Sequence, residues 1–151
     1  MRALVIGLAA LAIGCGPGTP VAQEQPGPAV DETARPWYSQ AADELAAFNR
    51  QAGQLVDAGK FDQAAALIGE TQPLADRLLS VPRPSLAGMQ AAADHDDLYG
   101  RVLLHSGRVG WARMTFQKNL VRWRNWKPQT PETEARTKAA AASVAECDRR
   151  M

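Results

Sequence analysis

The residues that could do chemistry are few, and their spacing argues against a shared site. Asp94-His95-Asp96-Asp97 has the composition of a metal-binding cluster. Adjacent residues of a helix point in different directions, so the sequence favours a solvated acidic turn over a metal site. The other histidine, His105, follows ten residues after His95, which places it about 80° away around a helix axis. His105 is expected near the C-terminus of a helix, where a histidine interacts favourably with the helix dipole, so no catalytic or metal-binding role is needed to explain it.

Known catalytic signatures are also missing from the sequence. It contains no G-x-S-x-G elbow, no P-loop, no dinucleotide glycine fingerprint and no H-E-x-x-H pair. Cys147 is too isolated to complete a metal site. We therefore predict no catalytic residue, no metal and no cofactor, and a protein that is not an enzyme. An enzyme built from unsuspected residues would need a deep pocket with converging polar groups.

Charge is spread unevenly, although 17 Lys and Arg nearly balance 16 Asp and Glu. Residues 31–97 hold eleven acids and five bases. Between Asp97 and Glu132 there is no acid, and the bases of this basic segment are Arg101, Arg108, Arg113, Lys118, Arg122, Arg124 and Lys127. Two interpretations stay open: the basic segment balances acidic neighbours inside the fold, or it faces an acidic partner, either a protein or an anionic polymer.

Tryptophans accompany these bases. Trp123 continues an apolar helical stripe and is predicted to be core, whereas Trp111 and Trp126 lie off that stripe. An exposed aromatic side chain beside a cation is typical of binding hot spots. Nucleic-acid binding would use the same residue types, but no nucleic-acid module is visible in the sequence, so no such partner is predicted.

The N-terminus has the features of an export signal. Residues 1–14 combine Arg2 with the apolar run ALVIGLAALAIG, a signal-peptide length that is too short for a comfortable membrane span. Ala12-Ile13-Gly14-Cys15 resembles a bacterial lipobox, with Ala12 where Leu is usual. We therefore predict lipidation of Cys15. The alternative is an ordinary secretory signal, in which case a Cys15–Cys147 disulfide becomes conceivable.

The segment after Cys15 is predicted to be a tether. Residues 16–36 carry five of the ten prolines and no apolar periodicity, so residues 15–36 are predicted to be a lipidated cysteine with a disordered spacer. Gly16 stands where an Asp would retain a lipoprotein at the inner membrane. The predicted location is therefore the bacterial outer membrane, facing the periplasm; a secreted or periplasmic soluble protein is the alternative.

From Trp37 onwards the apolar spacing predicts an all-α domain of about five helices, residues 37–151. Gly59 and Gly107 are predicted to end the first and third helices, and Ser85 to cap the start of the third. Pro73 is predicted to kink or interrupt the second. Thr130-Pro131-Glu132 opens a fifth, capping helix, with Ala135, Ala139 and Ala142 predicted to face inward.

Two helix pairs resemble tetratricopeptide repeats, whose signature is a small residue in the first helix, a glycine turn, then a small and a large apolar residue. These places are filled by Phe48, Ala52, Leu55, Gly59, Phe61, Ala64 and Ile68, and again by Tyr99, Gly100, Leu103, Gly107, Ala112 and Phe116. The glycines are 48 residues apart, against about 34 in the family. A generic five-helix bundle is the alternative.

The resemblance implies a groove lined by the first helix of each pair. The family's groove positions fall on Asn49, Gly53 and Asp57, and on Asp97, Arg101 and His105. Asn with Arg implies a grip on a peptide carboxylate. Five residues of the basic segment and its tryptophans complete the predicted partner-binding set: Trp111, Arg113, Arg122, Arg124 and Trp126.

The sequence as a whole predicts a lipid-anchored, non-enzymatic protein of the cell envelope. Its helical domain is expected to bind another protein, in a scaffolding or assembly role, and the acyl anchor to bind the membrane. The alternative function is binding of an anionic envelope polymer or lipid through the basic Trp/Arg helical hairpin. Polymer binding would weaken steeply with salt.

Overall fold

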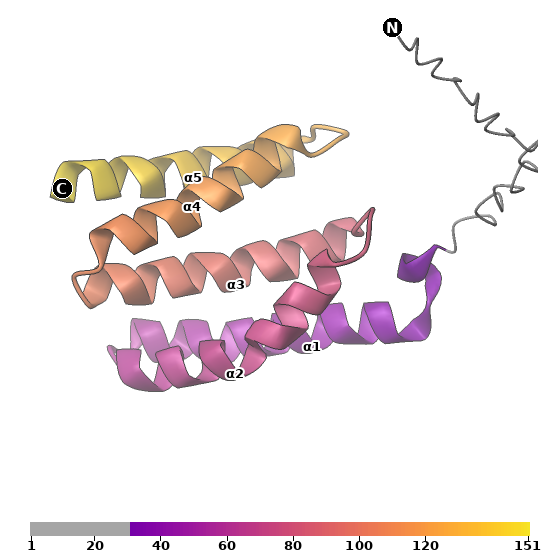
Figure 1. Ribbon diagram of the computed structural model, residues 1–151, viewed down its shortest axis with the longest axis horizontal. Coiled ribbons are helices and arrows are strands. Elements are labelled where there is room, and N and C mark those ends of the chain that lie inside the picture. Colours follow the sequence, from indigo (N-terminus) through magenta and orange to yellow (C-terminus); the bar gives the residue numbers. More distant parts are fainter. Residues whose placement is uncertain (1–30) are drawn as a thin grey trace, which may run out of the picture. The chain divides into compact units, whose positions relative to one another are not determined.

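The computed structural model describes residues 31–151 and confirms the all-α prediction for that part of the chain. A 3₁₀ turn, Glu32–Ala34, precedes five α-helices, and these residues form no strand. The helices are α1 (Pro36–Asp57), α2 (Phe61–Leu79), α3 (Leu86–His105), α4 (Val109–Asn125) and α5 (Pro131–Arg150) (Figure 1). The predicted signal peptide, Cys15 and most of the tether lie outside the described residues. None of these helices is long and apolar enough to cross a membrane.

Two of the helices, α3 and α5, begin at the predicted capping residues. Before α3, Ser85 Oγ accepts a hydrogen bond from the Gly88 N–H at 3.1 Å. Before α5, Thr130 Oγ1 accepts from the Thr133 N–H at 3.3 Å, while Thr133 Oγ1 accepts from the Thr130 N–H at 2.8 Å. Pro131 fills the first position of α5, where its missing N–H would have had no partner in the helix. Local sequence therefore determines both helix starts.

The two helix pairs, α1–α2 and α3–α4, share one turn geometry. Gly59 and Gly107 have φ of +72° and +73°, the left-handed region that favours glycine. In both turns the residue after the glycine donates its N–H to the carbonyl five residues earlier. The bonds are Lys60 to Leu55 at 2.8 Å and Arg108 to Leu103 at 2.9 Å. This Schellman arrangement satisfies the last carbonyls of α1 and α3.

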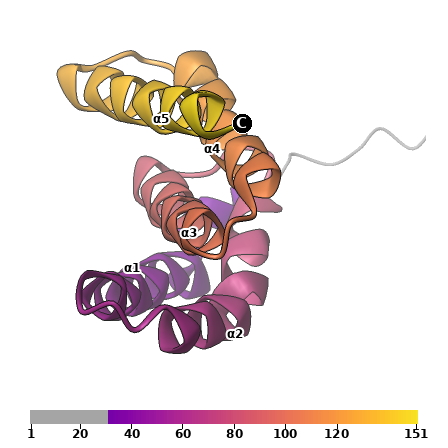
Figure 2. The same cartoon turned by 90° about the vertical axis from the view of Figure 1, so that its left-hand side faces the viewer.

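Consecutive helices pack on one another, and α1 also packs on α3. In Figure 2, α1, α3 and α5 lie on one side, and α2 and α4 on the other. The first helices of both pairs therefore form a layer with α5.

Two glycines let large side chains approach α3 closely. A Cβ at Gly100 would lie 2.5 Å from the Phe116 ring of α4, and one at Gly88 would overlap the Tyr38 ring. Tyr38 is 1% exposed; its hydroxyl donates to the Leu78 carbonyl at 3.3 Å and accepts from the Ser85 N–H at 3.2 Å. One side chain thus joins the start of α1, the end of α2 and the start of α3.

Pro73 bends α2 without ending it. The helix runs from Phe61 to Leu79, and its axis changes direction midway (Figure 1), because proline lacks an N–H and crowds the preceding turn. Side chains hydrogen-bond the carbonyls near the bend: Thr71 Oγ1 donates to Leu67 at 2.9 Å, and His95 Nε2 donates to Ile68 at 3.0 Å. Burial lowers the pKa of His95, so the neutral ring links α3 to the bend.

The predicted inward face of α5 is wrong. Ala135, Ala139 and Ala142 are exposed, and the side chains that face α4 and the core are Thr133, Ala140, Val144 and Cys147. Residues 139–142 are all alanine, so composition there cannot set the rotation of the helix. The Thr133 cap and the larger Val144 and Cys147 set it instead. Burial, followed by the charge of Asp148, raises the pKa of the Cys147 thiol.

Candidate functional site

The segment Asp94–Asp97 is not a solvated acidic turn, and that prediction is wrong. It lies in the middle of α3, where His95 is 1% and Asp96 4% exposed. The Asp96 carboxylate pairs with two bases of α4: Lys118 Nζ at 3.0 Å, and Arg122 Nη1. Successive helical residues point about 100° apart, so the members of this segment serve different neighbours. Within residues 31–151 no three His, Cys, Asp or Glu side chains gather as metal ligands.

Part of the basic segment is neutralised inside the domain. Besides the Asp96 pairs, Arg101 binds Asp57 at 3.0 Å and Arg113 binds Asp148 at 2.6 Å. In the described part of the chain, the bases of this segment with no acid within 4.0 Å are Arg108, Arg124 and Lys127. The internal-balance interpretation therefore holds for four of the seven bases, and the other three remain available to a partner.

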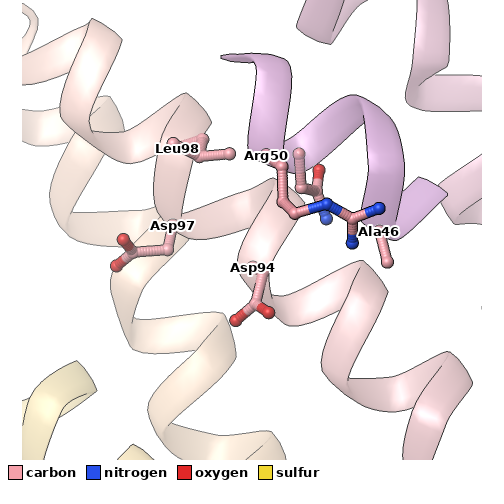
Figure 3. A pocket seen from close by; sticks show the side chains of 6 residues that line it. Ala46, Arg50, Asp94, Asp97 and Leu98 are labelled. Atoms are coloured by element: carbon pink, nitrogen blue, oxygen red, sulfur yellow. The ribbon is translucent and has the colours of Figure 1, made fainter. Parts of the chain in front are cut away.

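A cavity of about 330 Å³ lies between α1 and α3. It is lined by Ala46, Asn49 and Arg50 of α1 and by Asp94, Asp97 and Leu98 of α3. Figure 3 shows the Asp94 and Asp97 side chains on the same side of this opening, with the Arg50 guanidinium directed away from both. The cavity therefore presents separate positive and negative groups beside an apolar wall.

Asp97 is the electrostatically unusual residue of the cavity. Burial raises the pKa of its carboxyl, the charge of nearby Asp94 raises it further, and Arg101 opposes the shift. Among residues 31–151 neither Asp97 nor Arg50 has an ion-pair partner within 4.0 Å. Asp94, in contrast, is paired with Arg136 of α5 at 2.6 Å. A desolvated carboxylate without a partner favours binding of a cation from outside.

The predicted groove residues lie along α1 and α3, but several are engaged within the fold. Asn49 is 8% exposed and its amide donates to the Ala91 carbonyl at 2.7 Å. Further along, Arg101 pairs with Asp57, and the His105 ring stacks on Phe61 with centroids 3.5 Å apart. Asn49 and Asp97 are the members of this set that line the cavity.

The predicted residues of the basic segment lie on or next to α4, away from that cavity. Trp111 is 65% exposed, and Trp126 is half-buried with its ring edge against Trp123. Arg124 is exposed, whereas Arg113 and Arg122 hold the ion pairs with Asp148 and Asp96. The ten predicted partner-binding residues therefore fall in two separate places.

Sequence reasoning missed Arg50 and Leu98 in the cavity, and Met114 and Val121 on α4. For Arg50 a signal existed: the residues three and four positions away along α1 are Ala46, Ala47, Gly53 and Gln54, none of which can pair with it. For α4 the signal was apolar residues at helical spacing on the side opposite the buried stripe.

Comparison of the chain with protein-family models, with curated proteins and with solved structures returns no match.

Proposed function

We propose that the helical domain is a non-enzymatic protein-interaction module that binds a charged peptide segment of another protein in the cavity between α1 and α3. The observation that carries this proposal is the pair Asp97 and Arg50, which share the cavity without a partner in residues 31–151. A peptide that offers Lys or Arg to Asp97 and a carboxylate to Arg50 would complete charge-assisted hydrogen bonds that the domain leaves unmade.

The architecture supports a scaffolding or assembly role of the tetratricopeptide type. The turn repeated at Gly59 and Gly107, and the small residues packed under large ones, agree with that resemblance. The cavity is lined by α1 and α3, the first helices of the two pairs, where the family's groove would lie.

We further propose that the protein is anchored to the bacterial outer membrane through an acylated Cys15, facing the periplasm. The support is the sequence of residues 1–36 alone. Metabolic labelling with a fatty acid tests it: the wild type should incorporate label, and Cys15→Ser should not. Unlabelled wild type would favour the secreted or periplasmic form.

Photo-cross-linking in cells tests the peptide-binding proposal. A photoreactive amino acid at Ala46, which lines the cavity without contributing charge, should capture a protein that the same probe at exposed Gln63 on α2 does not. Arg50→Glu and Asp97→Asn should each abolish the product. Arg83→Glu, at an exposed loop position, is the matched control and should leave it intact.

Circular dichroism shows whether each variant is folded. The proposal fails if folded Arg50→Glu and Asp97→Asn both retain the Ala46 product, or if the Gln63 probe captures the same protein equally well.

A further inference from the structure

The outer surface of α4 is unusually apolar. Residues 31–151 expose five large hydrophobic side chains, of which three belong to α4: Trp111 at 65%, Met114 at 63% and Val121 at 46%. Their spacing of three and seven residues places them on one side of the helix, and Lys118 falls between them. We call Trp111, Met114, Lys118 and Val121 the α4 outer face.

The equivalent surface of α2 shows that the fold does not require this composition. The two turn glycines, Gly59 and Gly107, are 48 residues apart. The residues 48 positions before the α4 outer face are therefore its equivalents on α2, and they are Gln63, Ala66, Glu70 and Pro73. All four of these residues are exposed as well. Where one helix pair presents an amide, a methyl group and an acid to solvent, the other presents Trp, Met and Lys.

In the described part of the chain, unpaired positive charge lies at both ends of α4. Arg108 precedes the helix and Arg124 lies in its last turn, both exposed and, among residues 31–151, without an acid within 4.0 Å. Lys118 pairs with Asp96, but its side chain remains 49% exposed. No acid occurs in α4 itself. A helix with exposed Trp and Met among Lys and Arg is the composition that lies in the interface of an anionic bilayer.

From these observations we infer that the α4 outer face docks on the surface of an anionic lipid bilayer, with Trp111, Met114 and Val121 entering the headgroup region and Arg108 and Arg124 meeting lipid phosphates. A soluble anionic polymer would neutralise the bases but leave the apolar side chains in water. A bilayer satisfies both, because each base adds attraction to the anionic surface while the apolar side chains leave water. The inference does not depend on the cavity between α1 and α3.

A fluorescent probe on the full chain tests the docking directly. In a Cys15→Ser background, Met114→Cys is labelled with bimane, and Ala66→Cys serves as the matched control at the equivalent place on α2. Cys147 is fully buried and stays unlabelled in the folded protein. Vesicles of phosphatidylglycerol and phosphatidylcholine should shift the emission at position 114 to shorter wavelength, and vesicles of phosphatidylcholine alone should not. Adding Trp111→Gln should raise the lipid concentration needed by about tenfold or more.

Three results would overturn the inference. The first is no shift at position 114 with the anionic vesicles. The second is an equal shift at position 66, which would mean that another part of the chain, such as residues 1–14, brings the whole domain to the membrane without orientation. The third is a shift at position 114 that appears with rising protein concentration and no vesicles, which would assign the α4 outer face to a second copy of the chain.

Discussion

The α1–α2 and α3–α4 pairs are built on the same turn and differ in how their helices meet. The first pair has Ala52 and Ile68 in one buried cluster, whereas the second has Gly100 and Phe116 at the equivalent positions, where a Cβ on Gly100 would lie 2.5 Å from the Phe116 ring. The second pair combines a smaller residue on its first helix, Gly100 instead of Ala52, with a larger one on its second helix, Phe116 instead of Ile68. The packing rule is therefore conserved between the pairs while the side chains that satisfy it change.

The polar residues of the two pairs differ in a more consequential way. Asn49 corresponds to Asp97, and Asn49 makes an internal hydrogen bond where Asp97 faces the cavity without a partner among residues 31–151. Phe48 corresponds to Asp96, the buried acid that binds Lys118 and Arg122. The buried, paired acid Asp96 and the desolvated carboxyl of Asp97 thus both belong to the second pair. The first pair shows that the turn and the packing do not require these two acids. Asp96 and Asp97 are therefore features of the second pair beyond what its fold needs.

The largest effect is expected from removing the buried acid. Asp96→Asn should lower the free energy of unfolding by about 3 kcal/mol, because it leaves Lys118 and Arg122 without their partner; half exposure of Lys118 keeps the loss at the lower end of the range for broken buried pairs. Urea denaturation measures the loss.

Asp94→Asn is the matched control for that experiment. Asp94 is two residues away but its side chain is 49% exposed, and its pair with Arg136 should be worth less than about 1 kcal/mol. Equal losses in the two variants would contradict the view that burial, rather than ion pairing as such, makes Asp96 important.

Exchanging the packing of the second pair for that of the first is the next test. Gly100→Ala should destabilise the domain by about 1–3 kcal/mol, because the new Cβ would lie 2.5 Å from the Phe116 ring. Combining it with Phe116→Ile reproduces the Ala52 and Ile68 combination. The double variant should be more stable than the sum of the two single changes by about 1 kcal/mol or more. Strict additivity, measured by urea denaturation, would show that the two positions do not compensate each other.

The shared turn predicts equal effects at its two glycines. Gly59→Ala and Gly107→Ala should each cost about 1 kcal/mol, because both residues have positive φ and an added Cβ meets nothing within 4 Å, so backbone strain is the main term. Thermal unfolding followed by circular dichroism compares them. A difference of more than about 0.5 kcal/mol would mean that the two turns are not energetically equivalent.

The sequence predicts those features of the fold that are determined by residues close together in the chain, and it misses those that depend on contacts between distant residues. Ser85, Thr130, Gly59 and Gly107 act within a few residues of themselves, and their roles were predicted correctly. The environment of Asp96 depends on Lys118 and Arg122, more than 20 positions along the chain, and no local pattern indicates such a pairing.

The candidate site divides in the same way. The resemblance to a repeat family placed Asn49 and Asp97 at one groove, and both line the cavity. The Asn49 amide hydrogen-bonds the Ala91 carbonyl, whereas Asp97 has no ion-pair partner among residues 31–151. This difference depends on how α1 packs against α3. Whether a base is paired across helices, as Arg113 is, or unpaired, as Arg124 is among residues 31–151, is likewise a tertiary property.

The smallest stability effect is expected at Asp97, and it is the most informative about function. Because burial raises the pKa of this carboxyl in the folded protein, its protonated form is favoured by folding, and that contribution is lost as pH rises through the folded pKa. At neutral pH the wild type therefore carries an unfavourable carboxylate. Asp97→Asn, which copies Asn49 of the first pair, should be more stable there by no more than about 1 kcal/mol.

The pH dependence separates this explanation from a general improvement in packing. Below pH 3.8, the ordinary value for an Asp carboxyl, both side chains are neutral and the advantage of Asp97→Asn should disappear. Urea denaturation across the acid range measures the gap between the two proteins. A gap that does not change with pH, or a variant less stable than the wild type at neutral pH, would contradict a desolvated carboxylate. If Asp97 is a binding residue that lowers the stability of the domain, Asp97→Asn should be more stable than the wild type and should also lose the cross-linked partner.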